Sequence, residues 1–269
     1  MTDLTPITFG TDGWRAVIAE DYTFENLERV AQATADWLHA DYGTEGTNPP
    51  SVVLGHDTRF LGREFAERAA RVLAADGIHV TFAETIVSTP AVSWATQALG
   101  RDAGIVITAS HNPPAYNGYK IKADFGGPAP PEMVSKVEEA AAKVRPRTNH
   151  LPSFEELVDT RWIEPHDLRS GYLDAMREVL DIDAIVDAGL TVAHDAMFGA
   201  GQGIVTALLG EDAVVPVRHD INPGFHGQAP EPIERNLEPL QTAVVEEGCA
   251  AGLANDGDAD RIGMVDEHG

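Results

Sequence analysis

The amino-acid sequence predicts an α/β protein made of two similar three-layer α/β/α domains with mostly parallel sheets. Short apolar runs without strict alternation fit strands that are buried on both faces. These runs alternate with amphipathic helical stretches, a pattern typical of parallel sheets covered by helices. The alternation occurs twice, on either side of a boundary near residues 145–160, and 269 residues exceed the usual size of one domain. We therefore expect domains at 1–150 and 151–269.

Apolar periodicity predicts the elements of the first domain. Residues 24–42 carry apolar side chains at helical spacing and stop at Gly43, which predicts a helix. Residues 63–75 predict a second helix, which Gly77 ends. The other elements expected in this domain are strands over 51–55, 78–83, 104–108 and 119–122, and helices over 90–99 and 131–144.

The second domain repeats the alternation after an irregular segment, 145–166. We expect helices over 168–180 and 237–247, a Gly-rich turn followed by a helix over 199–209, and strands over 190–194, 213–217, 250–254 and 262–265. One strand in each half ends in an unusual polar loop, TASHNP (108–113) and NDGDADR (255–261). Because ligands bind at the carboxyl ends of the strands in such sheets, both loops are candidates for the functional site.

The chain is strongly acidic, with 43 Asp and Glu residues against 19 Lys and Arg residues and a net charge of -24. Its only lysines are Lys120, Lys122, Lys136 and Lys143. Such a charge repels nucleic acid and anionic lipid, so we expect neither as a partner. A phosphorylated ligand would need local arginine, lysine or a metal ion. The acidity fits either an ordinary solvated surface or a protein from an organism that lives in high salt. The sequence leaves both interpretations open.

Composition also bears on the cellular compartment. The apolar content is 43% and the mean hydropathy is -0.17, and no run reaches the roughly 18 apolar residues of a membrane span. The first residues lack the basic and apolar segments of a signal peptide. The single cysteine, Cys249, excludes an internal disulfide and fits a reducing compartment. We therefore expect a cytoplasmic protein that does not contact a membrane.

The loop NDGDADR places Asp256, Asp258 and Asp260 two residues apart, so that their carboxylates can converge on a hard cation. Three such charges repel one another without a counter-ion, although a solvated acidic turn is the alternative. The spacing also resembles an EF-hand with Glu267 at position twelve, but Arg261 stands where that loop needs glycine. Three carboxylates leave the coordination shell of a cation incomplete. This suits Mg²⁺, whose shell a phosphate often completes.

The loop TASHNP contains Ser110 and His111, which raises the possibility of a hydrolytic pair. Adjacent residues of an extended chain point to opposite sides, so His111 is poorly placed as the base for Ser110. The G-x-S-x-G elbow is also absent. Taken alone, the loop equally fits a turn with local Ser and Asn hydrogen bonds.

Beside a magnesium loop, Ser110 has a second interpretation as a carrier of a phosphoryl group. Its phosphate would be a ligand of the metal, and the metal would neutralise charge during phosphoryl transfer. Lys120, Arg15 and Arg261 are then candidates to hold phosphate oxygens or to move protons. Each of these three residues could instead be a solvated surface cation.

Five motifs together resemble the α-D-phosphohexomutases, the phosphoglucomutase/phosphomannomutase family, over their first two domains. The motifs are FGTDGWR (9–15), GHDTR (55–59), TASHNPPAYNGYK (108–120), DAMFGAG (195–201) and DGDADR (256–261). The resemblance implies reversible movement of phosphate between the 1- and 6-positions of a hexose phosphate, through a phosphoserine and a bisphosphorylated sugar. It also implies a sugar bisphosphate as activator.

The resemblance assigns roles to residues of this chain. Ser110 matches the phosphoserine. The matches to the Mg²⁺ ligands are Asp256, Asp258, Asp260 and the phosphate on Ser110. Lys120 and His111 match residues of proton transfer and the phosphate environment. Arg15 matches a catalytic cation of the active site, and Arg261 matches a cation that binds substrate.

The chain departs from the four-domain family because motifs of the third and fourth domains are not found. The strand IGMV leads into DEHG, a hairpin turn, with no returning strand. We expect a fragment that is inactive alone, with a free sheet edge that invites self-association. If 269 residues are the natural length, a non-catalytic module that binds Mg²⁺ or a phosphosugar is the alternative. A hydrolase using Ser110 is a third hypothesis, and the sugar, be it glucose, mannose or glucosamine phosphate, stays open, with glucose phosphate expected.

Overall fold

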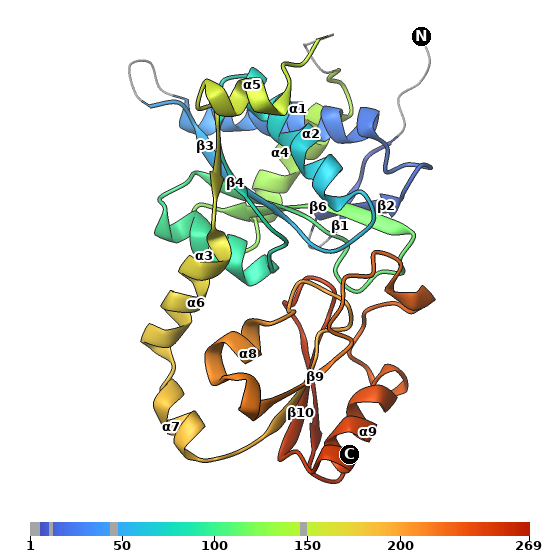
Figure 1. Cartoon of the computed structure of the whole chain (residues 1–269). Helices are drawn as coiled ribbons and strands as arrows, with labels where there is room; N and C mark the ends of the chain where they lie inside the picture. Colours follow the sequence, from blue (N-terminus) through green and yellow to red (C-terminus); the bar gives the residue numbers. More distant parts are fainter. Residues whose placement is uncertain (1–5, 11–12, 44–47, 146–149) are drawn as a thin grey trace.

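The computed structural model describes residues 6–10, 13–43, 48–145 and 150–269. It contains two α/β/α units, each built on its own sheet (Figure 1). The first sheet has the strand order β1-β2-β6-β5-β3-β4-β7, and the second has the order β11-β10-β8-β9. The predicted fold class, two α/β/α domains with mostly parallel sheets, is confirmed.

The first sheet combines parallel and antiparallel pairing. Its strands are β1 (Phe9–Gly10), β2 (Gly13–Val17), β3 (Ser51–His56), β4 (His79–Ala83), β5 (Ala103–Ile107), β6 (Tyr116–Ala123) and β7 (Ile163–His166). Strands β5, β3, β4 and β7 run parallel, and β6, β2 and β1 add antiparallel pairs at one side. The carboxyl ends of β3 and β5 are therefore neighbours at one edge of the sheet.

Helices cover both faces of this sheet. They are α1 (Phe24–Tyr42), α2 (Gly62–Ala75), α3 (Thr89–Ala98), α4 (Pro131–Ala141) and α5 (Phe154–Asp159). Helix α1 packs on α2 and α4, and α2 packs on α5, whereas α3 contacts β3 and β5. In β3, Val52 and Leu54 belong to one hydrophobic core and Val53 belongs to the other. This strand is buried on both faces, which explains why its sequence is apolar without alternation.

The segment predicted to be irregular, 145–166, instead contains α5 and β7. Strand β7 pairs with β4, so the first sheet extends to His166 and the predicted boundary at residue 150 falls inside the first unit. The pattern of β7 is weak because only Ile163 of its four residues is buried and because it contains Pro165, which an edge strand tolerates. Helix α5 did carry a signal, a capping box between Ser153 and Glu156.

The second unit begins with α6 (Leu168–Val179), which contacts α3 of the first unit and α8 of the second. Its other elements are α7 (Ile182–Asp187), β8 (Val192–Asp195), α8 (Ile204–Leu209), η1 (Glu211–Ala213), β9 (Val214–Val217), η2 (Phe225–Gly227), η3 (Glu234–Asn236), α9 (Glu238–Glu247), β10 (Ala251–Asn255) and β11 (Ile262–Asp266). Strands β10, β8 and β9 are parallel, and β11 runs antiparallel to β10. Helix α7 was not predicted, since none of its six residues is buried.

The two units meet through the loops that follow their strands. The loop after β5 and the loop after β10 lie in the region between the two sheets (Figure 1). Within the part of the chain that the structure describes, no helix is both long and apolar enough to cross a lipid bilayer.

Candidate active site

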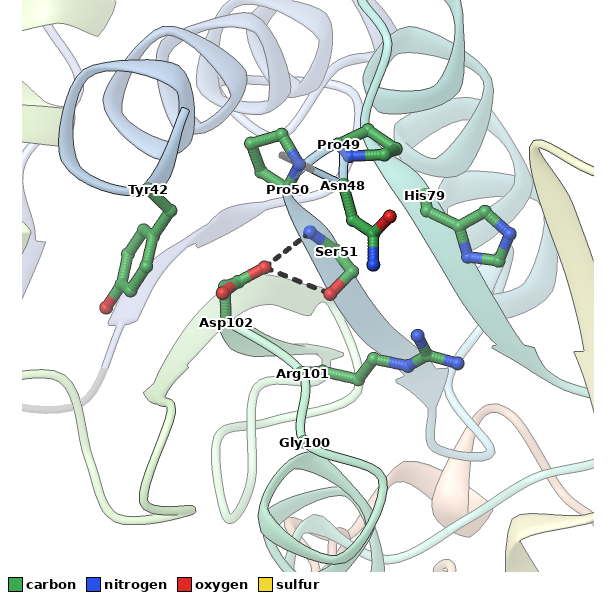
Figure 2. Close-up of a pocket in the computed structure, with 9 residues that line it drawn as sticks. All are labelled: Tyr42, Asn48, Pro49, Pro50, Ser51, His79, Gly100, Arg101 and Asp102. Carbon is green, nitrogen blue, oxygen red and sulfur yellow. Dashed lines mark hydrogen bonds between the residues drawn. The ribbon is translucent and has the colours of Figure 1, made fainter. Parts of the chain in front are cut away.

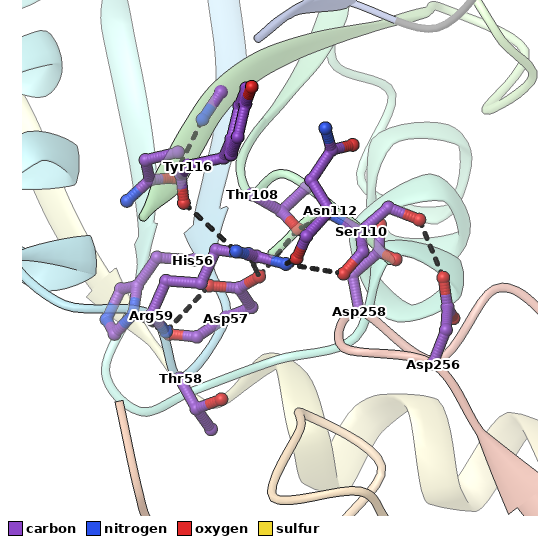
Figure 3. A network of polar contacts seen from close by, with 12 residues as sticks. His56, Asp57, Thr58, Arg59, Thr108, Ser110, Asn112, Tyr116, Asp256 and Asp258 are labelled. Atoms are coloured by element: carbon purple, nitrogen blue, oxygen red, sulfur yellow. Dashed lines mark hydrogen bonds and ion pairs between the residues drawn. The ribbon is translucent and has the colours of Figure 1, made fainter. Parts of the chain in front are cut away.

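Ser110 lies immediately after β5, with its backbone in the left-handed region at φ 53° and its side chain fully buried. Its backbone N–H donates to Thr108 Oγ1 (2.9 Å), and its hydroxyl donates to Asp256 Oδ2 (2.6 Å; Figure 3). A residue with a Cβ adopts this conformation at an energetic cost, so the surrounding contacts must hold it. The result is a serine oxygen that points from the first unit at a carboxylate of the second.

Arg59 holds the serine loop in place. Its buried guanidinium donates to the carbonyl oxygens of Ser110 (2.7 Å), Asn112 (2.7 Å), Pro113 (2.9 Å) and Tyr116 (3.0 Å; Figure 3). These four acceptors lie along one segment of the chain, residues 110–116. One charged side chain therefore sets the path of the backbone on both sides of His111.

Asp57 in turn fixes Arg59. Asp57 Oδ2 lies 3.3 Å from Arg59 Nε and accepts the Thr108 hydroxyl at 2.6 Å. Burial raises the pKa of Asp57 to about 6, although the charge of Arg59 and the hydrogen bond from Thr108 lower it. Sequence reasoning assigned no role to Asp57 and Arg59, although both stand in GHDTR at the carboxyl end of a strand next to β5.

The aspartate loop lies opposite the serine. Carboxylate oxygens of Asp256, Asp258 and Asp260 all lie within 4.8 Å of one another. Asp256 Oδ1 accepts the backbone N–H groups of Asp260 (3.0 Å) and Arg261 (3.1 Å), which closes the turn between β10 and β11. Because strands flank the loop, it is not the helix–loop–helix of an EF-hand.

The donor set of this loop fits a hard divalent cation. Asp258 Oδ1 is buried and has no hydrogen-bond partner among the described residues, which is costly unless something binds it. Three carboxylates and the Ser110 hydroxyl offer the oxygen ligands that Mg²⁺ prefers. Asp256, Asp258 and Asp260 are therefore the residues that would hold the ion.

Lys120 of β6 joins the same cluster from the first unit. Its buried ammonium donates to Asp258 Oδ2 (2.7 Å) and Asp260 Oδ2 (2.8 Å). The hydroxyl of Thr89, at the start of α3, also donates to Asp258 Oδ2 (2.6 Å), a contact that the sequence did not suggest. Thr89 and Lys120 thus orient Asp258 so that its second oxygen stays unpaired.

The two buried aspartates differ in protonation. Burial and the neighbouring charge of Asp258 raise the pKa of Asp256 to about 7, against the hydrogen bond from Ser110. Burial also acts to raise the pKa of Asp258, but the charge and hydrogen bond of Lys120 outweigh it and lower the pKa to about 2. Without a metal ion, one proton therefore offsets part of the negative charge in the loop.

The remaining predicted residues lie around the serine loop. Arg15 in β2 donates from Nη1 to Asn112 Oδ1 at 2.9 Å. Burial lowers the pKa of His111, and the charges of Arg261 and Arg15 lower it further, so its imidazole is neutral at neutral pH. Arg261 itself is exposed. The structure thus brings all eight predicted residues to one place, and their roles stay predictions.

Comparison with known proteins gives matches over both units. The family model for phosphoglucomutase/phosphomannomutase α/β/α domain I matches residues 6–148, and that for domain II matches residues 170–269. A phosphoglucomutase/phosphomannomutase of Thermococcus kodakarensis is 34% identical over 97% of the chain and 55% of its own length. A phosphoglucosamine mutase of Acidothermus cellulolyticus is 37% identical over 98% of the chain and 55% of its own length. The chain thus spans about half the length of these relatives.

Solved structures give the same result. The structure of a candidate phosphomannomutase from Thermus thermophilus superimposes with a TM-score of 0.86 at 36% identity. The match covers 98% of the chain and 57% of that protein. A phosphoglucomutase from Paramecium, at 21% identity and a TM-score of 0.79, shares the fold.

Proposed function

The chain belongs to the phosphoglucomutase/phosphomannomutase family, of which it contains domains I and II, and from this premise we propose that its protein is a Mg²⁺-dependent phosphohexomutase. The protein would move phosphate between the 1- and 6-positions of a hexose. One observation carries the proposal: Ser110 Oγ lies 2.6 Å from Asp256 Oδ2, at the edge of a carboxylate cluster suited to a divalent cation. A phosphoryl group on this oxygen would be formed beside the metal.

Each residue of the site has a part in this proposal. Ser110 carries the phosphoryl group, which passes to a sugar hydroxyl when the bond to Oγ breaks and the bond to the sugar oxygen forms. Bound Mg²⁺ would offset negative charge on the phosphate. His111, neutral and partly buried, is available to exchange a proton with the reacting hydroxyl. Lys120, Arg15 and Arg261 supply local positive charge for an anionic substrate in a strongly acidic protein.

The identity of the sugar is a further proposal. The named relatives act, by name, on glucose, mannose or glucosamine phosphates, and we propose glucose phosphate as the substrate of this protein. A sugar 1,6-bisphosphate would serve as activator by phosphorylating Ser110. Because the chain spans about half of its relatives, we expect these 269 residues alone to bind Mg²⁺ and accept phosphate on Ser110 with little or no turnover.

Transfer of phosphate to the chain tests the proposal directly. Incubation with Mg²⁺ and glucose 1,6-bisphosphate should add one phosphoryl group, which intact mass and peptide mapping place on Ser110. Ser110→Ala should prevent the addition, whereas Ser135→Ala, at an exposed serine of α4, should leave it unchanged. Equal labelling of the Ser110→Ala variant and the wild type would refute the phosphoserine.

A coupled assay tests the complete reaction. The full-length protein, given glucose 1-phosphate and a trace of the bisphosphate, should form glucose 6-phosphate. If it turns over none of the hexose or hexosamine phosphates, the proposal is wrong even when the chain binds Mg²⁺.

Two earlier expectations stay predictions. The first is a cytoplasmic location. The second is self-association through β11, which pairs with β10 on one side and exposes Ile262 and Met264 by 60% and 65%. Size measurement at increasing protein concentration would show whether the edge associates.

A further inference from the structure

We propose that the first unit has a second ligand site, which binds a small molecule carrying both a phosphate and hydroxyl groups. A pocket of about 640 Å³ lies where β3, β4 and β5 begin (Figure 2). It is lined by Tyr42, Asn48, Pro49, Pro50, Ser51, His79, Gly100, Arg101 and Asp102. Its volume is within the range of sites for small ligands.

The pocket is separate from the serine site. Ser51 and His79 open β3 and β4, and Arg101 and Asp102 precede β5, whereas Ser110 follows the other end of β5. A six-residue strand such as β3 spans about 17 Å at roughly 3.3 Å per residue. None of the residues that line this pocket belongs to the serine site.

One side of the pocket presents two basic side chains. Arg101 and His79 lie on the same side in Figure 2. Arg101 Nε and His79 Nδ1 are both buried, and neither has a hydrogen-bond partner among the described residues. Buried polar atoms are usually hydrogen-bonded, and no described residue supplies a partner for these two, so a ligand in the pocket is a candidate partner.

Arg101 differs from those arginines of the chain that pair with a carboxylate, such as Arg63 with Glu67 and Arg68 with Glu28. No described residue forms an ion pair with Arg101. Its guanidinium presents a planar set of donors that matches phosphate oxygens, so an anion of that shape fits this side of the pocket.

The opposite side presents groups that recognise hydroxyls. Asp102 and Tyr42 lie across the pocket from Arg101 in Figure 2. Asp102 Oδ2 accepts the backbone N–H (2.7 Å) and the hydroxyl (3.0 Å) of Ser51, which holds the carboxylate in one orientation. A carboxylate repels phosphate but accepts hydrogen bonds from hydroxyls. The two sides therefore orient a ligand with phosphate toward Arg101 and hydroxyls toward Asp102.

Residue-resolved NMR of the protein tests this site. Glucose 6-phosphate should shift the backbone amides of Arg101 and Asp102 and the ring signals of His79 in a saturable manner at low ionic strength. Inorganic phosphate should act more weakly, and glucose should have no effect at the same concentration. Because the serine site lies elsewhere, binding there would shift a different set of signals.

Variants decide whether the pocket residues are responsible. Arg101→Gln should weaken binding at this site roughly tenfold or more, since it removes a charged hydrogen-bond donor. His79→Gln should also weaken it, and thermal unfolding would show that both variants stay folded. Arg235→Gln, at an arginine whose side chain is 76% exposed, is the matched control and should bind as the wild type does. The absence of shifts at the pocket, equal binding of glucose, or no effect of Arg101→Gln would each overturn the proposal.

Discussion

At the scale of single residues, the position of Ser110 depends on a buried arginine. Arg59 bonds four carbonyl oxygens of the serine loop, and the carboxylate of Asp57 lies against it. A buried ion pair adds little net stability compared with apolar residues, but loss of one partner leaves an unpaired charge. The main effect of the pair between Asp57 and Arg59 is to hold the backbone of Ser110 in the left-handed region of φ and ψ.

Arg59→Gln should therefore be strongly destabilising. It leaves Asp57 buried without its cation and removes donors from the loop, so we expect a loss of about 3–5 kcal/mol in the free energy of unfolding. Urea unfolding measures this loss. Labelling of Ser110 by glucose 1,6-bisphosphate, measured under conditions where the variant is folded, should also slow.

Arg63→Gln is the control for this change. Arg63 is half-exposed and pairs with Glu67 on the surface of α2, so its loss should cost about 0.5 kcal/mol or less. Similar losses for both variants would show that Arg59 has no special role in the loop.

The pKa values of the aspartate loop predict how metal binding depends on pH. The pKa of Asp256 is raised to about 7, so this carboxyl is protonated below that pH and a proton competes with Mg²⁺. Asp258, with a pKa lowered to about 2, stays ionised throughout. Mg²⁺ affinity should fall toward tenfold per pH unit below about 7 and level off above it.

Calorimetry in buffers of different ionisation enthalpy would measure this dependence and the proton released on binding. Asp256→Asn should remove most of the dependence, because an amide does not titrate in this range. A Mg²⁺ affinity of the wild type that does not change between about pH 5.5 and 8.5 would contradict the prediction.

At the scale of secondary-structure elements, equivalent strands of the two units end alike. Strand β3 ends in His56 and is followed by Asp57, and β8 ends in His194-Asp195. Each aspartate accepts the backbone N–H two residues later at 2.9 Å, and each pairs with an arginine. In both units, therefore, the strand is followed by a turn that an aspartate side chain stabilises, and this turn leads toward the candidate site.

The serine loop and the aspartate loop pack closely against each other at Gly257. This glycine lies between Asp256 and Asp258, and a Cβ placed on it would lie 2.5 Å from the carbonyl oxygen of Ser110. Gly257→Ala should push the two loops apart, with a loss of about 1–3 kcal/mol in stability and a weaker Mg²⁺ affinity. Calorimetric titration with Mg²⁺ and urea unfolding would measure both effects.

Gly224→Ala is the matched substitution at an exposed glycine, where Asn222 Oδ1 would lie 3.4 Å from the new Cβ. It should leave Mg²⁺ affinity unchanged. If Gly257→Ala behaves in the same way, close contact between the loops is not needed for metal binding.

Elements differ in how far the sequence predicts them. Apolar runs that end in polar loops predicted β5 and β10, and with them Ser110 and the aspartates. Strand β7 and the contact of Thr89 with Asp258 were not predicted. Strand β7 has only one buried residue, and the contact of Thr89 with Asp258 joins positions 169 residues apart. Both depend on packing between distant segments, which leaves no local pattern in the sequence.

At the scale of the whole molecule, the large negative net charge affects stability. A net charge of -24 on 269 residues creates repulsion that folding must overcome, and the site adds three clustered carboxylates. Few lysines are present, and Lys120 is buried in this cluster. The fold therefore places scarce positive charge where it offsets the aspartates.

Added salt should accordingly stabilise the protein. Screening of the repulsion should raise the free energy of unfolding as NaCl increases from about 0.05 to 0.5 M, where the Debye length shortens severalfold. Unfolding in urea, which is uncharged, measures the change. A free energy that stays constant or falls over this range would show that repulsion does not limit stability, and would argue against a salt-rich source.

The contact between Ser110 and Asp256 also has a consequence for biosynthesis. The two residues are 146 positions apart, so at about 5–20 residues per second a ribosome makes the aspartate roughly 7–30 s after the serine. The braces of the serine loop, Asp57, Arg59 and Thr108, all precede Ser110 in the chain. A nascent chain can therefore shape its serine loop first, and the second unit must emerge before the aspartate loop can face it.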